Sequence, residues 1–234
     1  MESHESFLTN LSRLRERITN ACERCGRAVD EVNLMAVTKT HPAEAVEWAL
    51  GAGLRHIGEN RVQEAAEKRP RVTAPGGYWE LIGPLQSNKA RLALGCVDRI
   101  QTVDRLKLVR VLDRLCGEMG KRGYPILMQV NVAEDPAKHG CEVAEAPALL
   151  EAILQSENLR IEGLMTIGEL TDEEARIRRT FSRLRGLRDR LRESFGRPLP
   201  VLSMGMTEDM ELAIEEGSTL LRVGTALFGA RGAW

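Results

Sequence analysis

Asn33-Leu34-Met35-Ala36-Val37-Thr38-Lys39 is the stretch that decides the fold. Four apolar residues run directly into a threonine and a lysine. A continuous apolar run is typical of a strand covered on both faces, as in a parallel sheet. The lysine would then lie at the carboxyl end of the strand, where α/β folds bind their ligands. Taken alone, the stretch also fits a solvated lysine that merely closes a strand.

Seven further segments predict strands, at Leu54–Ile57, Trp79–Ile82, Val97–Thr102, Pro125–Val132, Ile161–Ile167, Leu199–Met204 and Leu220–Val223. Helical patterns separate them, at Pro42–Leu50, Val62–Lys68, Ala90–Leu94, Arg105–Met119, Ala146–Ile153, Glu173–Phe195 and Glu208–Glu216. This alternation predicts an α/β fold, a (β/α)8 TIM barrel that forms one domain over residues 1–234. A doubly wound open sheet is the alternative.

An extra helix is expected before the first strand. Phe7, Leu11, Leu14 and Ile18 recur at helical spacing, and Gly26 marks the end of the pattern. Cys22 and Cys25 lie in this helix as a C-x-x-C pair, but no second cysteine or histidine pair completes a zinc set. The sequence therefore predicts no metal site.

Composition excludes several classes of protein. Hydrophobic residues make up 43% and charged residues 29%, and the net charge is −1, so nothing points to nucleic acid. No apolar run approaches the roughly 20 residues that a membrane span needs. The first residues are polar and do not resemble a secretory signal. Five scattered cysteines fit reduced thiols and a cytoplasmic location.

Arginines crowd the predicted helix Glu173–Phe195 and raise the possibility of a nucleic-acid face. Acidic residues are interspersed among them, however, and no aromatic residues line the polar side. We interpret this helix as having a solvated face, and we expect no nucleic-acid partner.

The carboxyl ends of the barrel strands all meet at one mouth. The sequence brings there Lys39, Asn60, the loop from Ser203 to Met206, and Arg222 followed by Gly224 and Thr225. The small residues after the last two strands predict a phosphate site, although plain turns would look the same. Arg222 lies in an apolar strand, where it needs a structural ion pair or a ligand atom as its partner.

An amine, a phosphate cradle and an arginine at one mouth suit pyridoxal 5′-phosphate (PLP). The lysine would form the Schiff base, the small residues would hold the phosphate, and the arginine would face the ring nitrogen.

The same segments resemble the pyridoxal-phosphate homeostasis protein family, single-domain relatives of the alanine racemase N-terminal barrel with PLP fold type III. The resemblance is carried by Ala36–Pro42, Gly58–Asn60, Ile82–Lys89, Gly163–Ile167, Leu202–Met206, Asp209-Met210 and Arg222–Gly229. These motifs run in order over nearly the whole chain. Thr38 and Ile57 depart from the family, which usually has serine and phenylalanine there.

The resemblance implies that Lys39 carries PLP as an internal aldimine. It also implies that Ser203, Gly224 and Thr225 hold the phosphate, that Arg222 faces the pyridine nitrogen, and that Asn60 lines the pocket. Met206, in the same loop as Ser203, completes the predicted set of cofactor-binding residues.

Two arguments favour a carrier over an enzyme, so no catalytic residue is predicted. Arginine can only donate hydrogen bonds, so it would leave the ring nitrogen unprotonated and the ring a weaker electron sink. Two-base racemisation also needs a second acid or base, which the racemases take from a tyrosine of an added domain. The only tyrosines here, Tyr78 and Tyr124, precede their strands.

The sequence thus predicts a cytoplasmic PLP-binding protein that takes part in homeostasis of intracellular PLP. Its expected partners are PLP and apo PLP-dependent enzymes, and the family resemblance implies a monomer. A slow PLP-dependent amino-acid racemase is the alternative, and an interaction module whose PLP signals occupancy is a third.

Overall fold

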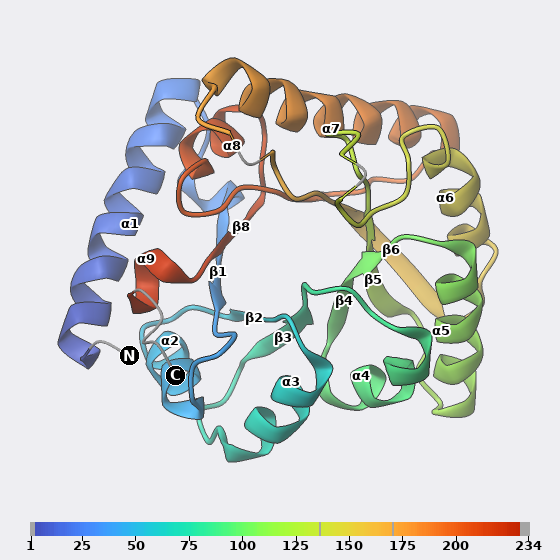
Figure 1. Ribbon diagram of the computed structural model, residues 1–234, viewed down its shortest axis with the longest axis horizontal. Coiled ribbons are helices and arrows are strands. Elements are labelled where there is room, and N and C mark those ends of the chain that lie inside the picture. The colour runs from blue at the N-terminus through green and yellow to red at the C-terminus, as the bar shows by residue number, and fades with distance from the viewer. Residues whose placement is uncertain (1–2, 136, 170, 230–234) are drawn as a thin grey trace.

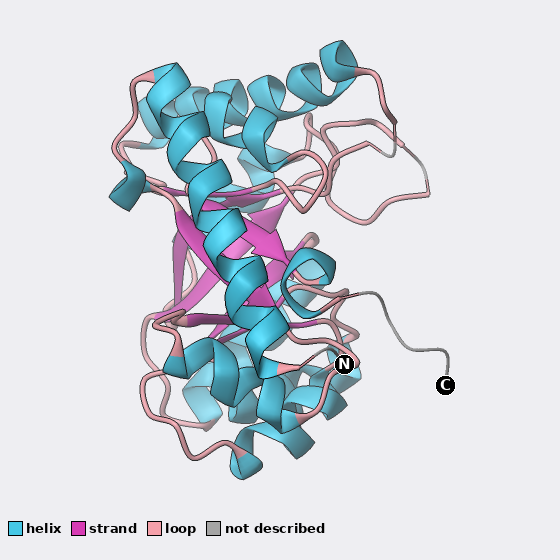
Figure 2. Cartoon of the chain, turned by 90° about the vertical axis from the view of Figure 1, so that its left-hand side faces the viewer, coloured by secondary structure: helices cyan, strands magenta, loops and turns pink. Residues whose placement is uncertain are grey.

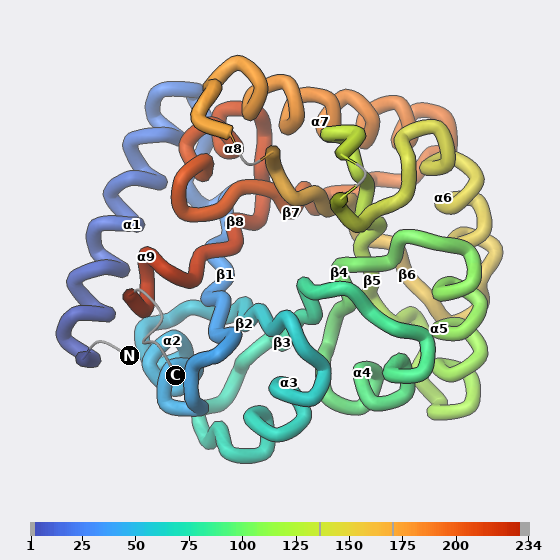
Figure 3. Tube along the Cα trace, in the orientation of Figure 1, coloured from blue at the N-terminus to red at the C-terminus, as the bar shows by residue number. Residues whose placement is uncertain are grey.

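The computed structural model describes residues 3–135, 137–169 and 171–229. Eight parallel strands close into a barrel in sequence order (Figures 1 and 3). The prediction of a (β/α)8 barrel is therefore confirmed, and the alternative of a doubly wound open sheet is excluded. The strands are β1 (Asn33–Val37), β2 (His56–Glu59), β3 (Tyr78–Leu81), β4 (Arg99–Val103), β5 (Tyr124–Gln129), β6 (Leu159–Met165), β7 (Val201–Ser203) and β8 (Leu220–Val223).

Helices follow the strands and surround the barrel (Figure 1). They are α1 (His4–Cys25), α2 (Ala43–Gly51), α3 (Val62–Lys68), α4 (Ala90–Cys96), α5 (Leu106–Glu118), α6 (Ala146–Leu154), α7 (Glu174–Phe195), α8 (Met210–Glu215) and α9 (Thr225–Phe228). Short 3-10 turns occur at Val29–Glu31, Arg69–Arg71 and Ser87–Lys89.

The extra N-terminal helix α1 forms as predicted. The Ser3 side chain accepts a hydrogen bond from the backbone N–H of Ser6 at its start, and Gly26 adopts a left-handed φ of 69° at its end. Its apolar stripe is buried against α8 and α9, and Figure 2 shows the helix crossing in front of the strands. The helix therefore covers the side of the barrel where the first and last strands meet.

Closure joins β1 to β8. Met35 lies opposite Arg222 and Ala36 opposite Val223 in a parallel register. Because of this pairing, the first and last strands end side by side, although almost the whole chain separates them. The predicted lysine and arginine therefore come from adjacent strands.

Side chains alternate between two environments along each strand. Ala36, Ile57 and Leu221 face the helices and belong to the large outer core. Met35, Val37, Ile82 and Leu220 form a small apolar cluster inside the barrel. Much of the remaining interior is polar, and it contains the buried side chains of Glu80, Arg99, Gln101, Ser203 and Arg222.

Some predicted boundaries were wrong by one to three residues. β2 extends through Glu59 instead of ending at Ile57, and β7 covers only Val201–Ser203 of the predicted Leu199–Met204. Leu199 has a φ of 40°, which is incompatible with an extended strand. No helix was predicted after β8, but the segment there forms the short helix α9.

Candidate functional site

Lys39 lies just beyond the end of β1, where the sequence predicted it. Met35 and Val37 face the barrel interior, and Lys39 follows Val37 by two residues, in the turn after the strand. Its side chain is half-buried. Thr40 follows with a left-handed φ of 64°, and its backbone N–H donates to Glu64. The chain therefore turns sharply away after presenting the lysine.

A buried ion pair supports the backbone directly before Lys39. The Lys68 ammonium donates to the Thr38 carbonyl oxygen over 2.8 Å and to Glu59, while the Thr38 hydroxyl donates to Glu59 over 2.6 Å. Burial raises the pKa of Glu59 more than the nearby charge of Lys68 lowers it. Among the described residues, Glu59 Oε2 is the buried side-chain oxygen that no hydrogen bond satisfies.

Asn60 lies at the end of β2, beside β1, and is half-buried. Gly83, at the end of β3, packs against its backbone, because a Cβ on Gly83 would lie 2.1 Å from the Asn60 carbonyl oxygen. Only glycine allows these two strand ends to approach so closely. Asn60 is thus held at the mouth by a fixed backbone.

The loops after β7 and β8 have the close packing expected of a phosphate cradle. Gly205 has a φ of 92°, and a Cβ there would lie 2.5 Å from Ala213 Cβ. A Cβ on Gly224 would lie 3.1 Å from the Val37 carbonyl oxygen, so the start of α9 is pressed against the end of β1. Leu227 and Phe228 both donate to the Gly224 carbonyl oxygen. The N–H groups of Thr225 and Ala226 therefore lead the helix, where anions bind readily.

Arg222 is a buried cation whose guanidinium donates hydrogen bonds to uncharged oxygens. One terminal nitrogen donates to Ser203 Oγ over 2.8 Å and the other to the Thr166 carbonyl oxygen over 2.7 Å. Burial lowers its pKa to about 10, with partial compensation from the charges of Asp209 and Glu80. The guanidinium thus stays charged at neutral pH, and a ligand acceptor in the mouth would reduce the cost of burying it.

The structure brings most of the predicted residues to one mouth. Arg222 and Ser203 touch directly, and Gly224, which precedes Thr225, packs against Val37, two residues before Lys39. Met206 lies in the loop after β7 and is the most exposed hydrophobic residue of this predicted set. Its backbone N–H donates to Asp209 over 2.5 Å, and its side chain is 39% exposed. The assigned cofactor roles of these residues stay predictions.

The sequence reasoning missed three buried polar residues around this mouth. Gln101 accepts a hydrogen bond from the Ser203 hydroxyl, and Glu59 and Lys68 form the pair beneath Thr38. For Gln101 the available signal was its spacing from Arg99, since residues two apart on β4 share one face and both of these are polar.

Other features do not compete with this mouth. Among the described residues no cluster of histidine, cysteine and acidic side chains could hold a metal ion, and all five cysteines are free thiols. In the same part of the chain no helix is long and apolar enough to cross a membrane.

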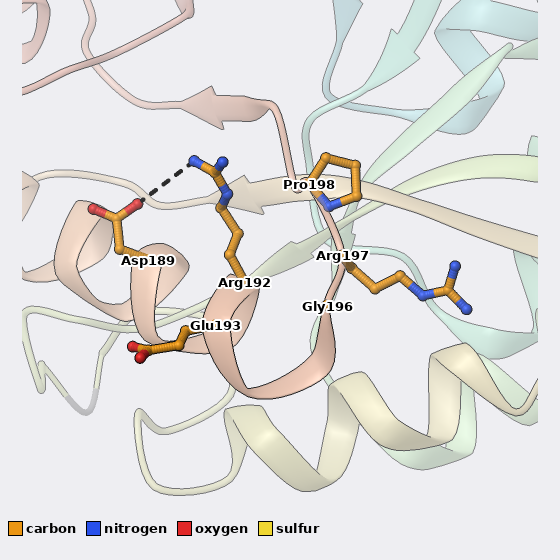
Figure 4. A pocket seen from close by; sticks show the side chains of 6 residues that line it. All are labelled: Asp189, Arg192, Glu193, Gly196, Arg197 and Pro198. Atoms are coloured by element: carbon orange, nitrogen blue, oxygen red, sulfur yellow. Dashed lines mark ion pairs between the residues drawn. The ribbon is translucent and has the colours of Figure 1, made fainter.

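A surface hollow at the end of α7 is bounded by Asp189, Arg192 and the turn Gly196–Pro198 (Figure 4). Asp189 and Arg192 form an ion pair across part of it, with 3.9 Å between the closest nitrogen and oxygen. Because Pro198 precedes β7, this hollow lies at the amino end of the barrel, away from Lys39.

The fold and the mouth define a barrel of the alanine racemase type. The model for the family "alanine racemase, N-terminal domain" matches residues 9–232. The pyridoxal phosphate homeostasis protein of Pseudomonas aeruginosa is 44% identical over 225 residues, which cover 95% of this chain and 94% of that protein. The corresponding Escherichia coli K12 protein is 39% identical over 230 residues, 95% of each chain.

The solved structure of PipY from Synechococcus elongatus, with PLP bound, superposes with a TM-score of 0.81 at 40% identity. The match covers 92% of this chain and 99% of PipY. The chain therefore belongs to the pyridoxal phosphate homeostasis protein family.

Proposed function

We propose that this chain binds PLP as a Schiff base on Lys39 and takes part in homeostasis of intracellular PLP. One observation carries the proposal: β1 pairs with β8, so the lysine-bearing strand end adjoins both the buried Arg222 and the start of α9. An amine, a buried cation and an anion-binding helix start are the groups that PLP requires. PipY, which binds PLP, supports the same assignment.

Each residue has a distinct task in this proposal. Ser203, Gly224 and Thr225 hold the phosphate, and Arg222 donates to the ring nitrogen. Asn60 lines the pocket beside Lys39. The bound cofactor supplies an aldehyde that reacts with amines. Lys68 and Glu59 keep the backbone of Thr38 in place, so that the Lys39 amine stays directed at the mouth.

The properties of Arg222 favour holding the cofactor over using it. Its guanidinium remains protonated at neutral pH even with a pKa of about 10, so it can only donate to the ring nitrogen. A ring nitrogen that accepts this bond carries no proton, and the ring withdraws electrons less strongly. We therefore propose a carrier or buffer without robust turnover.

The two tyrosines support the same conclusion. Tyr78 and Tyr124 begin β3 and β5, at the end of the barrel opposite Lys39. The Tyr124 hydroxyl donates to the Val97 carbonyl oxygen over 2.8 Å, and burial raises the pKa of Tyr78 to about 12. Neither phenol is available as a second acid or base at the mouth.

We further propose a cytoplasmic monomer that delivers PLP to apo PLP-dependent enzymes. The five free thiols fit a reducing compartment. Pull-downs with PLP-loaded and PLP-free protein separate this role from that of an interaction module. A carrier should transfer its cofactor to an apo enzyme, whereas a module should retain a partner that depends on occupancy.

The central test uses the visible absorbance of the PLP-loaded protein. Lys39→Ala should abolish the absorbance of the Schiff base, while Lys107→Ala, on the exposed face of α5, should leave it unchanged. Borohydride reduction followed by peptide mapping should place the adduct on the peptide that contains Lys39. An unchanged spectrum in Lys39→Ala, or an adduct on another lysine, would refute the assignment.

Deuterium exchange at the Cα of L- and D-amino acids, followed by NMR, separates the carrier from a slow racemase. The loaded wild-type protein should catalyse no exchange above the Lys39→Ala background. Exchange that depends on Lys39 would show that the site forms carbanions, and the carrier proposal would have to be abandoned.

A further inference from the structure

A chain of hydrogen bonds crosses the barrel interior from Arg222 to Glu80. Arg222 donates to Ser203 over 2.8 Å, Ser203 bonds Gln101 over 2.7 Å, and Gln101 bonds Glu80 over 2.7 Å. These four side chains are at most 4% exposed and come from β8, β7, β4 and β3. The chain thus joins the arginine of the mouth to a carboxylate deep in the barrel.

The chemistry of its two ends fixes the direction of every bond. Arginine has only donors, so the Ser203 oxygen must accept from Arg222 and its hydroxyl hydrogen must point to Gln101 Oε1. The Gln101 amide nitrogen then donates to the Glu80 carboxylate. A flipped Gln101 amide would set its NH2 group against Ser203 and its oxygen against the carboxylate, so one arrangement alone is compatible.

Glu80 is a reliable acceptor at the end of this chain. Burial on its own would raise its pKa, but the hydrogen bond with His56 and the charge of Arg99 outweigh burial and lower it. Arg99 donates to the same carboxylate oxygen as Gln101, over 2.6 Å. Glu80 is therefore ionised at neutral pH and keeps Gln101 in its orientation.

This chain of hydrogen bonds restricts the orientation of the Arg222 guanidinium. Ser203 Oγ and the Thr166 carbonyl oxygen hold its two terminal nitrogens, and two anchors fix the plane of a rigid group. The carbonyl oxygen belongs to the backbone, whereas the hydroxyl belongs to a side chain whose hydrogen Gln101 accepts. Without Gln101, Ser203 could rotate and donate elsewhere, and one of the two anchors would loosen.

We propose that Gln101 is a positioning residue for recognition of the pyridine nitrogen, acting through Ser203 and Arg222. The inference rests on the proposed function, because it assumes that PLP binds with its ring nitrogen toward Arg222. Gln101, on β4, would not touch PLP itself. It would influence the affinity for the pyridine ring through the orientation of Arg222. The phosphate end of the ligand is unaffected by it.

The test compares two ligands that differ only at the ring nitrogen. PLP and its 1-deaza analogue carry the same aldehyde and phosphate, but the analogue has a C–H group where Arg222 would donate. Both are titrated into wild-type protein, Gln101→Met and the control Thr102→Val. Thr102 is the next residue on β4 and is also buried, but its hydroxyl donates to the Gly83 carbonyl oxygen, outside the chain.

Gln101→Met should weaken PLP binding roughly tenfold, the equivalent of one charge-assisted hydrogen bond, and leave the affinity for the 1-deaza analogue within about twofold. Thr102→Val should weaken neither ligand. Gln101→Leu, which removes the same amide and leaves Ser203 in place, should reproduce the selective loss, and it serves as the test if Gln101→Met does not fold.

A double-mutant cycle adds a readout that a purely structural effect would not move. In an Arg222→Met background, Gln101→Met should no longer change the affinity for PLP, because the guanidinium that Gln101 positions is absent. Equal losses for both ligands, no loss for either, or additive effects in the cycle would overturn the inference. Wild-type protein that binds PLP without involving Lys39 would overturn the proposed function instead.

Discussion

Lys68 and Glu59 are buried charges of opposite sign that contact the backbone and side chain of Thr38, directly before Lys39. Lys68 is 8% exposed and Glu59 fully buried. Removing one partner of such a pair leaves an uncompensated charge in the interior, which costs more than the pair itself contributes. The backbone of Thr38 accepts a hydrogen bond from the same ammonium, so the stability of the fold and the placement of Lys39 are linked at this position.

We therefore expect Lys68→Met to lower the free energy of unfolding by about 3–5 kcal/mol at pH 7. Urea denaturation measures this free energy of unfolding. Lys107→Met, on the exposed face of α5, is the control. A loss no larger than that of the control would show that the pair is dispensable.

The pH dependence of this variant has a definite sign. The pKa of Glu59 already lies above its ordinary value of 4.5, and loss of Lys68 removes the charge that lowers it. Above that ordinary value the folded state then holds more protons than the unfolded chain, so stability falls as pH rises through the folded pKa. Acidification from pH 7 toward pH 5 should recover part of the loss in Lys68→Met. A further loss over that range would contradict the assignment.

At the residue scale, the sequence predicts some members of the site and not others. Lys39 and Arg222 could be predicted because charged groups in or after apolar strands are rare and demand a partner. Gln101 could be placed on the inner face of β4, but its bond to Ser203 could not be predicted, because Ser203 comes from β7. The pairing of Lys68 with Glu59 could not be predicted either, because it depends on how α3 packs beside β2. The bond between Gln101 and Ser203 spans 102 positions in the chain. No local pattern specifies such a contact.

The effect of replacing a glycine by alanine depends on whether the glycine lies near a strand end or within a helix, and two glycines illustrate this. Gly83 ends β3 against the Asn60 carbonyl oxygen, and Gly186 lies within α7 with only the end of the flexible Arg190 side chain nearby, at 3.5 Å. An added methyl group clashes with backbone in the first case and finds ordinary contact in the second.

Gly83→Ala should destabilise the protein by about 1–3 kcal/mol, because the ends of β2 and β3 must move apart. Gly186→Ala should stabilise it by about 0.5–1 kcal/mol, because alanine loses less conformational freedom in a helix. Thermal unfolding measures both changes, and PLP titration should detect weaker binding in Gly83→Ala alone. Similar shifts in both variants would contradict this reasoning.

At the element scale, the order and type of the strands and long helices were predictable from periodicity. The short helix α9 was not, because four residues are too few for a 3.6-residue pattern and glycines flank them. Its helical turn depends on packing: Phe228 is stacked on Phe7 of α1, with 5.4 Å between ring centroids. The helical conformation of this segment is thus set by tertiary contacts and not by its local sequence.

The whole molecule relies on α1 to cover the junction of its first and last strands. Phe7 is 1% exposed and contacts both Trp48, on α2, and Phe228, at the end of α9. In Figure 1, α9 lies between α1 and the end of β8. The position of the helix that leads the proposed phosphate site is therefore tied to the N-terminal helix.

Phe7→Ala should cost about 3–5 kcal/mol of stability and also weaken PLP binding, because α9 loses its packing partner. Leu112→Ala, at a fully buried position of α5, is the control, with a similar cost in stability and unchanged affinity. Calorimetry gives the stabilities, and titration below the unfolding range gives the affinities. Equal effects of both variants on PLP binding would show that α1 does not support the site.

At the scale of the whole molecule, the barrel was predictable because eight alternations leave few topologies for a chain of this length. Its polar interior was not, since sequence periodicity identifies which residues share a face but not which of them bond. Arg99 reaches both Glu80 and Glu162, on two other strands. Such partners are set by the closure and stagger of the whole barrel.

The polar interior also limits how this protein can serve as a scaffold for design. The usual way to strengthen a small barrel is to fill it with hydrocarbon side chains, one position at a time. Here each apolar replacement would leave the donors and acceptors of its neighbours unmatched, so the network must be exchanged as a set or kept whole. An engineer would do better to vary the loops around the mouth and to treat the four linked side chains as a fixed part.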